Sequence, residues 1–160
     1  MSARTAVYDS GMLVALLRGK PVALVMHHAL RAAAHRPVII GPVFTQCWRP
    51  DPGTVHAFSQ YLMDCTVPHT RGTASPLRGS GTAAGCVACA SAFSLDSYKR
   101  AGAMLGKAVL PAKKRPDAVD ALVVVTAALH GPAQIITSEP DDMRAYAATL
   151  DRADIAVERI

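Results

Sequence analysis

Long apolar runs are missing from this sequence of 160 residues. Proline, glycine or charged residues interrupt every apolar stretch, so none approaches the roughly 18–20 residues that a membrane-spanning helix needs. Residues 1–5 lead directly into a short apolar segment and an acid, and they lack the pattern of a secretory signal peptide. We therefore expect a cytoplasmic protein that makes no membrane contact.

Tight pairs of metal-binding cysteines are also scarce, although the chain has four cysteines. Cys86 and Cys89 have the spacing of a metal knuckle, and Cys65 with His69 could complete a set of four ligands. A structural zinc site normally shows two tight ligand pairs, and here the first pair is loose. We interpret Cys47 and Cys65 instead as small core residues, and we expect the histidines to be scattered, with the pair at residues 27–28 on the surface.

Charged residues make up only 18% of the chain and hydrophobic residues 51%, which is typical of a globular domain. The net charge of +5 is compatible with an anionic partner but does not require one. One dense basic cluster is formed by Lys113, Lys114 and Arg115. Charge alone fits a solvated loop as well as a phosphate contact. The position of the cluster just before Asp117 favours a role in holding a nucleic acid backbone.

Short apolar segments alternate with amphipathic segments along the chain, and this alternation predicts a parallel sheet covered by helices on both faces. We expect one α/β domain spanning residues 1–160, a three-layer α/β/α sandwich with four or five strands. The predicted strands are residues 5–8, 37–40, 134–137 and 155–160, and the predicted helices are residues 10–18, 22–34, 43–48, 54–63, 95–108, 117–130 and 141–150.

Residues 66–94 interrupt this pattern. The segment is rich in glycine, serine, threonine and alanine, and it shows no sustained hydrophobic period. Long connections of this kind within a compact domain are usually functional or disordered. We expect a flexible insertion.

Acidic residues stand where predicted strands end or helices begin. Asp9 follows the first strand, Asp117 opens an apolar helix, and Glu139 follows the strand at residues 134–137. In an open α/β sheet, ligands bind beyond the carboxyl ends of the strands, so these acids can converge there and share a divalent metal ion. Each aspartate could also serve only as a helix cap. Asp120, one turn beyond Asp117, is either a further acid of the site or the partner of a basic residue.

Four motifs in this order resemble a PIN-domain nuclease, and most of all the toxin component of VapBC-type toxin–antitoxin pairs. They are Asp9-Ser10, the TQCWR segment at residues 45–49, Asp117 at the start of a buried helix, and the TSEPDD segment at residues 137–142. The resemblance covers roughly residues 5–49 and 95–160. It implies a PIN-like fold and a metal-dependent endoribonuclease.

The resemblance also implies roles for individual residues. Asp9, Asp117 and Glu139 would bind Mg²⁺ or Mn²⁺ and, with Gln46, form the catalytic set. The family usually has Glu where this chain has Gln46, and an amide brings no negative charge, so metal affinity should fall. Supporting residues would be Ser10, Asp120, Thr137 and Asp142, and RNA-binding residues would be Lys113, Lys114 and Arg115.

The expected partners are an RNA substrate and a small antitoxin protein, with a homodimer as a further option. The alternative function is a catalytically weak or inactive PIN-like protein that binds RNA or a protein partner. A phosphoacceptor domain is disfavoured, since only Asp9 is acidic after the first strand and no lysine follows Lys114.

Overall fold

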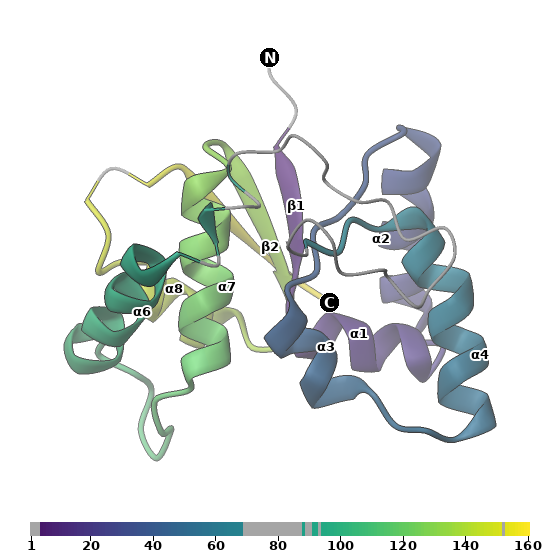
Figure 1. Cartoon of the computed structure of the whole chain (residues 1–160), viewed down its shortest axis with the longest axis horizontal. Coiled ribbons are helices and arrows are strands. Elements are labelled where there is room, and N and C mark those ends of the chain that lie inside the picture. Colours follow the sequence, from purple (N-terminus) through teal and green to yellow (C-terminus); the bar gives the residue numbers. More distant parts are fainter. Residues whose placement is uncertain (1–3, 69–87, 89–90, 93, 152) are drawn as a thin grey trace.

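The computed structural model describes residues 4–68, 88, 91–92, 94–151 and 153–160, and the structural statements below concern these residues (Figure 1). Over this part of the chain the fold is mixed α/β, with seven helices and an open three-stranded parallel sheet. In chain order the elements are β1 (Thr5–Tyr8), α1 (Ser10–Leu17), α2 (Pro21–Ala32), α3 (Gly41–Cys47), α4 (Pro52–Tyr61), a 3-10 turn (Leu62–Asp64), α6 (Leu95–Lys107), α7 (Ala118–Leu129), β2 (Ala133–Thr137), α8 (Pro140–Ala147) and β3 (Ile155–Arg159).

The sheet has the order β1-β2-β3, and both neighbouring pairs are parallel. Among the described residues, the pairing on the free side of β1 continues only as isolated bridges, from Val7 to Val38 and from Val38 to Thr66. Four or five strands were expected, and the described residues form three regular strands. The segment around Val38 stays a single bridge because Pro37 has no N–H to donate and helix α3 already begins at Gly41.

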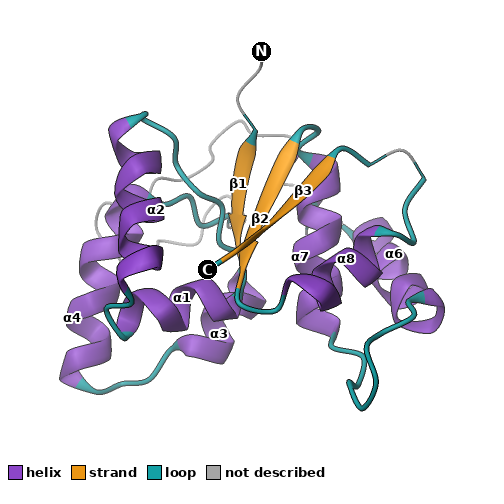
Figure 2. Ribbon diagram, turned by 180° about the vertical axis from the view of Figure 1, so that it is seen from behind, coloured by secondary structure: helices purple, strands orange, loops and turns teal. Residues whose placement is uncertain are grey.

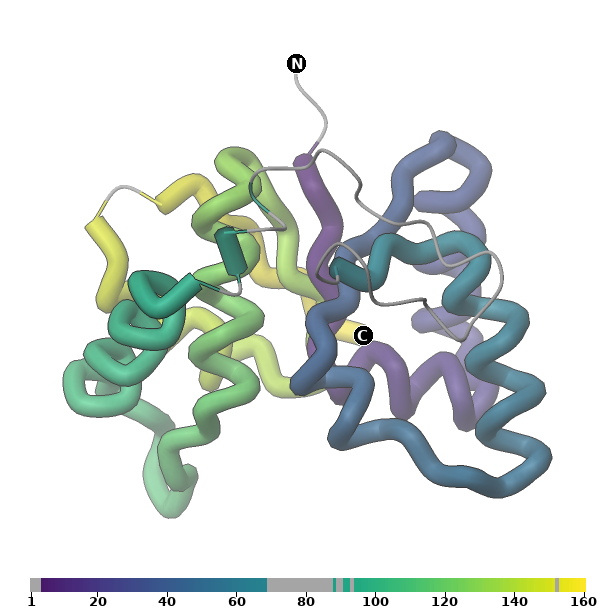
Figure 3. The backbone as a smooth tube through the Cα atoms, viewed as in Figure 1, coloured from purple at the N-terminus to yellow at the C-terminus, as the bar shows by residue number. Residues whose placement is uncertain are grey.

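The chain reverses its direction of travel across the sheet between β1 and β2. From β1 it moves outward to Val38 and Thr66, and it later returns to form β2 and β3 on the other side of β1. This path can be followed in Figure 3. Such a reversal leaves a crevice at the carboxyl ends of the two central strands, the usual ligand position in open α/β sheets.

Helices α1 to α4 lie on one side of the sheet and α6, α7 and α8 on the other (Figures 1 and 2). Helix α7 packs against β1 and β2, and α8 packs against β2 and β3. Apolar residues of the strands, such as Val7 and Ile135, are fully buried in the core. The continuous apolarity of α7 predicts burial on most of its sides, and residues 123–127 are indeed all buried.

His27 is a correction to the sequence-based expectation, because it is 1% exposed rather than on the surface. Helix α2 begins at Pro21, which places position 27 on the same inward face as Ala23. Its Nδ1 lies 3.1 Å from the hydroxyl of Tyr8, and its ring meets the ring of Tyr61 edge-on. Burial lowers the pKa of the His27 imidazole, so this side chain is a neutral core residue at neutral pH.

Cys47 and Cys65 are buried free thiols, as the sequence predicts. Cys86, Cys89 and His69, the other members of the alternative zinc set, lie outside the described residues, as does most of the expected insertion at residues 66–94. Within the described ranges, no single helix has the length and apolarity needed to cross a bilayer. Helices α1 and α2 meet that criterion only as a pair, and the chain bends by 105° between them.

Candidate functional site

A pocket of about 230 Å³ opens where β1 and β2 end, at the reversal point of the sheet. Its walls come from the start and end of α1, the first turn of α7, and the loop that follows β2. It combines acidic, basic and small residues. The lining residues that bear on chemistry are Asp9, Ser10, Arg18, Lys20, Asp120 and Glu139.

Asp9 is fixed by hydrogen bonds to both of its carboxylate oxygens. Oδ1 accepts from the backbone N–H of Met12 at 2.8 Å and so caps α1, while Oδ2 accepts from the Thr137 hydroxyl at 2.5 Å. The same hydroxyl accepts from the backbone N–H of Glu139 at 2.9 Å. Thr137 therefore connects the ends of β1 and β2. Burial raises the pKa of Asp9 above its usual value, and the hydrogen bonds from Thr137 and Met12 offset only part of that rise.

Asp117 and Asp120 have different positions, although they are one turn apart. Asp117 caps α7, since its Oδ1 accepts from the N–H of Val119 at 2.7 Å, and its own N–H donates to the hydroxyl of Tyr146 at 2.8 Å. Asp117 does not line the pocket, whereas Asp120 does. The structure thus brings Asp9, Asp120 and Glu139 together around the pocket, with Asp120 in the place that the sequence suggests for Asp117.

Carboxyl groups are crowded around Asp120. Burial raises its pKa to about 7, with further contributions from the negative charges of Asp117, Asp9, Asp142 and Glu139. A carboxyl in a pocket whose pKa is shifted close to 7 by burial and by neighbouring charges is a candidate functional group.

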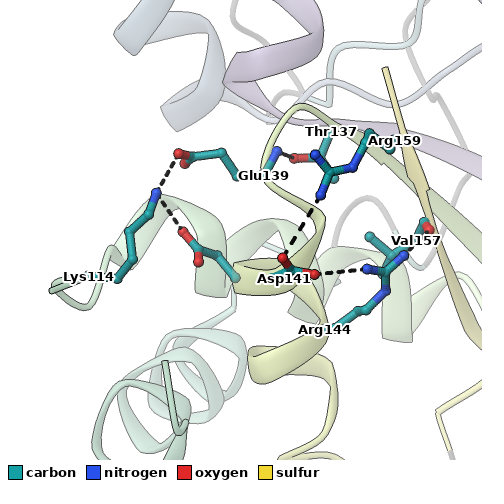
Figure 4. Close-up of polar contacts among 8 residues, drawn as sticks. Lys114, Thr137, Glu139, Asp141, Arg144, Val157 and Arg159 are labelled. Atoms are coloured by element: carbon teal, nitrogen blue, oxygen red, sulfur yellow. Dashed lines mark hydrogen bonds and ion pairs between the residues drawn. The ribbon is translucent and has the colours of Figure 1, made fainter. Parts of the chain in front are cut away.

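Lys114 already neutralises part of this charge. Its ammonium forms ion pairs with Glu139 and with Oδ2 of Asp142, the latter at 3.1 Å (Figure 4). Asp142 is 7% exposed, so it is a buried member of the acidic group. Asp141 lies beside Asp142 in the first turn of α8 but points elsewhere, and it pairs with Arg144 at 3.0 Å and with Arg159 at 3.9 Å (Figure 4).

The remaining predicted residues lie apart from the pocket, except for Ser10. Gln46 is exposed near the end of α3, and its backbone carbonyl accepts from the guanidinium of Arg49 at 3.2 Å. Lys113 and Arg115 are exposed beside Lys114. Arg18 and Lys20 line the pocket but were not predicted from the sequence. The available sequence signal was Gly19, which ends the first predicted helix and so places Arg18 and Lys20 at a turn.

The side chains of this site are of the type that binds divalent cations, but they are not arranged as a set of metal ligands. Carboxylates are the ligands that Mg²⁺ and Mn²⁺ prefer. Burial and, after it, the neighbouring negative charges raise the pKa of Asp120, and a cation would offset those charges. Yet no three His, Cys, Asp or Glu side chains of the described residues are positioned to hold a metal ion. In this conformation Lys114 supplies the positive charge, and Glu139 would have to leave it to become a ligand.

Comparisons with known proteins do not assign the chain to a family. No protein-family model matches it, and searches of curated proteins and of solved structures find no similar protein.

Gly11 shapes the pocket through close packing, and we expect Gly11→Ala to destabilise the protein by about 1–3 kcal/mol. A Cβ at this position would lie 3.1 Å from the backbone nitrogen of Ser138, so the loop after β2 would have to move. The matched control is Gly102→Ala in α6, where a Cβ meets no atom of the described residues within 4 Å. That change should stabilise the protein by roughly 0.5–1 kcal/mol through helix propensity. Equal and stabilising shifts in denaturant midpoint for both variants would show that the contact is not tight.

Proposed function

We propose that this chain is a PIN-like nuclease, a three-layer α/β/α domain that hydrolyses RNA phosphodiesters with the help of Mg²⁺ or Mn²⁺. One observation carries the proposal: three carboxylates, one after β1, one in the first turn of α7 and one after β2, line a single pocket at the reversal point of a parallel sheet. Residues this distant in sequence share a pocket there because parallel strands end at the same edge. The order of motifs that resembles the PIN family supports the same reading.

In this proposal Asp9, Asp120 and Glu139 hold the metal ion, and Asp120 takes the position first given to Asp117. The bound ion would supply an activated water and offset negative charge on the scissile phosphate. The protein residues prepare this arrangement. Thr137 orients the Asp9 carboxylate through its hydroxyl. Lys114 holds Glu139 and Asp142 in place while no cation neutralises them.

The alternative proposal is a PIN-like protein that binds RNA or a protein partner with little or no catalysis. Two observations favour it. Gln46 brings no charge and lies exposed outside the pocket, and Lys114 occupies Glu139 and Asp142. Cleavage in the presence of metal decides between the two proposals.

The test is an RNase assay with Mn²⁺ or Mg²⁺ on the wild type, Asp9→Asn and Asp51→Asn. Both aspartates cap a helix, Asp9 at α1 and Asp51 at α4, where its Oδ1 accepts from the N–H of Thr54 at 2.9 Å. Only Asp9 lines the pocket. We therefore expect Asp9→Asn to lose cleavage by about 10²-fold or more, and Asp51→Asn to retain it. Metal-independent cleavage, or equal loss in both variants, would contradict a metal site at Asp9.

The proposed biological setting is a toxin–antitoxin pair in the cytoplasm. A segment of a small antitoxin would cover the acidic pocket and its basic surroundings. Expression of the wild type should then arrest growth, and expression of Asp9→Asn at the same level should not. Arrest by both variants would indicate an effect unrelated to cleavage.

A further inference from the structure

Two basic side chains, Arg18 and Lys20, line the same pocket as the acids, on the side formed by the junction of α1 and α2. We propose that Arg18 and Lys20 bind a backbone phosphate of single-stranded RNA next to the phosphate that lies over the acids. This inference rests on the proposed function for its substrate class. It assigns RNA binding to a place other than the basic cluster suggested by the sequence.

The backbone at this junction is held firmly while the side chains stay exposed. Arg18 is the C-cap of α1, and its N–H donates to the carbonyl of Val14 at 3.0 Å. The N–H of Lys20 donates to the carbonyl of Ala15 at 2.9 Å, and Lys20 precedes the first residue of α2. Gly19 connects them with φ of +64°, a conformation that glycine adopts without strain. The two cationic groups are thus presented from a fixed turn.

Both side chains are also available to a ligand. Other basic residues beside acids are paired, as Arg144 is with Asp141 and Lys114 is with Glu139. Arg18 and Lys20 share a pocket with three carboxylates, but neither forms an ion pair within the described residues. Acids alone would repel a phosphodiester strand. Cations at the edge of the pocket give that strand a favourable path across it.

The size of the pocket indicates what kind of anion fits. Its volume of about 230 Å³ is below the roughly 300–1,000 Å³ typical of pockets that enclose a whole small ligand. A strand that crosses the pocket, with one phosphate at the acids and the next at the cations, suits this shape. Lysine and arginine contacts to phosphates fix register and carry no base information, so binding should be independent of sequence.

The experiment measures binding of a fluorescent oligouridine by anisotropy, in an Asp9→Asn background so that the strand stays intact, with Mg²⁺ present. The variant is the double change Arg18→Gln and Lys20→Gln. The matched control is Lys99→Gln with Lys107→Gln, two exposed lysines on α6. The comparison variant is Lys113→Gln with Arg115→Gln, from the basic cluster. Thermal melts show whether each variant is folded.

The variant loses its contact to one phosphate, so the slope of log K against log salt should fall by about 0.7, the contribution of one neutralised phosphate on a single strand. Between about 50 and 200 mM salt, the parent should therefore lose roughly 2.6-fold more affinity than the Arg18/Lys20 variant. The Lys99/Lys107 control should keep the parent slope. An unchanged slope in the Arg18/Lys20 variant, a loss confined to the Lys113/Arg115 variant, or no binding of the strand would each overturn the inference.

Failure of this inference is distinguishable from failure of the proposed function. RNA that binds through Arg18 and Lys20 but is never cleaved by the wild type supports the inference and contradicts the nuclease. Metal-dependent cleavage by the wild type, with an Arg18/Lys20 variant of unchanged affinity and KM, supports the nuclease and contradicts the inference.

Discussion

Asp120→Asn is expected to stabilise the folded protein at pH 8 and to leave its stability nearly unchanged at pH 4. The carboxyl of Asp120 has a pKa of about 7 in the folded protein, against 3.8 for an unperturbed aspartate. Between these values the folded protein holds a proton that the unfolded chain has released. Stability therefore falls as pH rises from about 4 to 7, and the loss is complete above pH 7.

The full shift would correspond to about 4 kcal/mol, at 1.36 kcal/mol for each pH unit. Asp120 is partly exposed, and solvent screening reduces the value, so we expect a gain of about 2 kcal/mol from asparagine at pH 8. Asparagine keeps the shape of the protonated acid and carries no charge. Urea unfolding at both pH values measures the effect, and the stability of Asp120→Asn should vary less with pH than that of the wild type.

Asp51→Asn is the control for a general effect of removing an aspartate. Hydrogen bonds to Thr54 lower the pKa of the exposed Asp51 carboxyl, so its loss should destabilise the protein at pH 8, opposite in sign to Asp120→Asn. Mn²⁺ adds a second readout. It should raise the melting temperature of the wild type more than that of Asp120→Asn, because the variant lacks both a ligand and the repulsion that a cation relieves. Equal pH profiles for the wild type and Asp120→Asn would mean that the folded protein does not raise the pKa of this carboxyl.

Much of the fold follows from local sequence patterns. The helix starts at Asp9 and Asp117 are signalled by capping residues, and strands β1 and β2 by short apolar runs. The helix predicted at residues 54–63 instead begins at Pro52, after its cap Asp51. These signals depend on neighbours in sequence, so they can be read without the structure. The edge of the sheet is different. Whether the segment at Val38 pairs as a strand depends on the proline beside it and on the position of Thr66.

The site was predictable as a region and less so residue by residue. The ends of β1 and β2 place Asp9 and Glu139 at one edge, as alternation of strands and helices predicts. The choice between Asp117 and Asp120 depends on the rotation of α7 about its axis, which packing against the sheet decides. The ion pairs of Lys114 depend on the path of an irregular loop, and no periodic pattern encodes that path.

Thr137→Val should destabilise the protein by about 2–3 kcal/mol at pH 7, because it removes the hydroxyl that donates to a buried carboxylate. Thr137 is fully buried at the end of β2, and Asp9 is 3% exposed. Valine has nearly the same shape and suits a strand, so the variant changes hydrogen bonding with little change in packing. It leaves Oδ2 of Asp9 without this donor and the N–H of Glu139 without its acceptor.

The pH dependence identifies the cause. Without the Thr137 hydroxyl the pKa of Asp9 rises further, since that bond lowers it in the wild type. A raised folded-state pKa costs stability as pH increases, so the difference between Thr137→Val and the wild type should be larger at pH 8 than at pH 4. Thr137→Ser keeps the hydroxyl and is the matched control. It should lose only the methyl packing, about 1 kcal/mol, with no added pH dependence. Equal losses in the valine and serine variants at all pH values would assign the effect to packing, and Thr137 would then have no part in orienting Asp9.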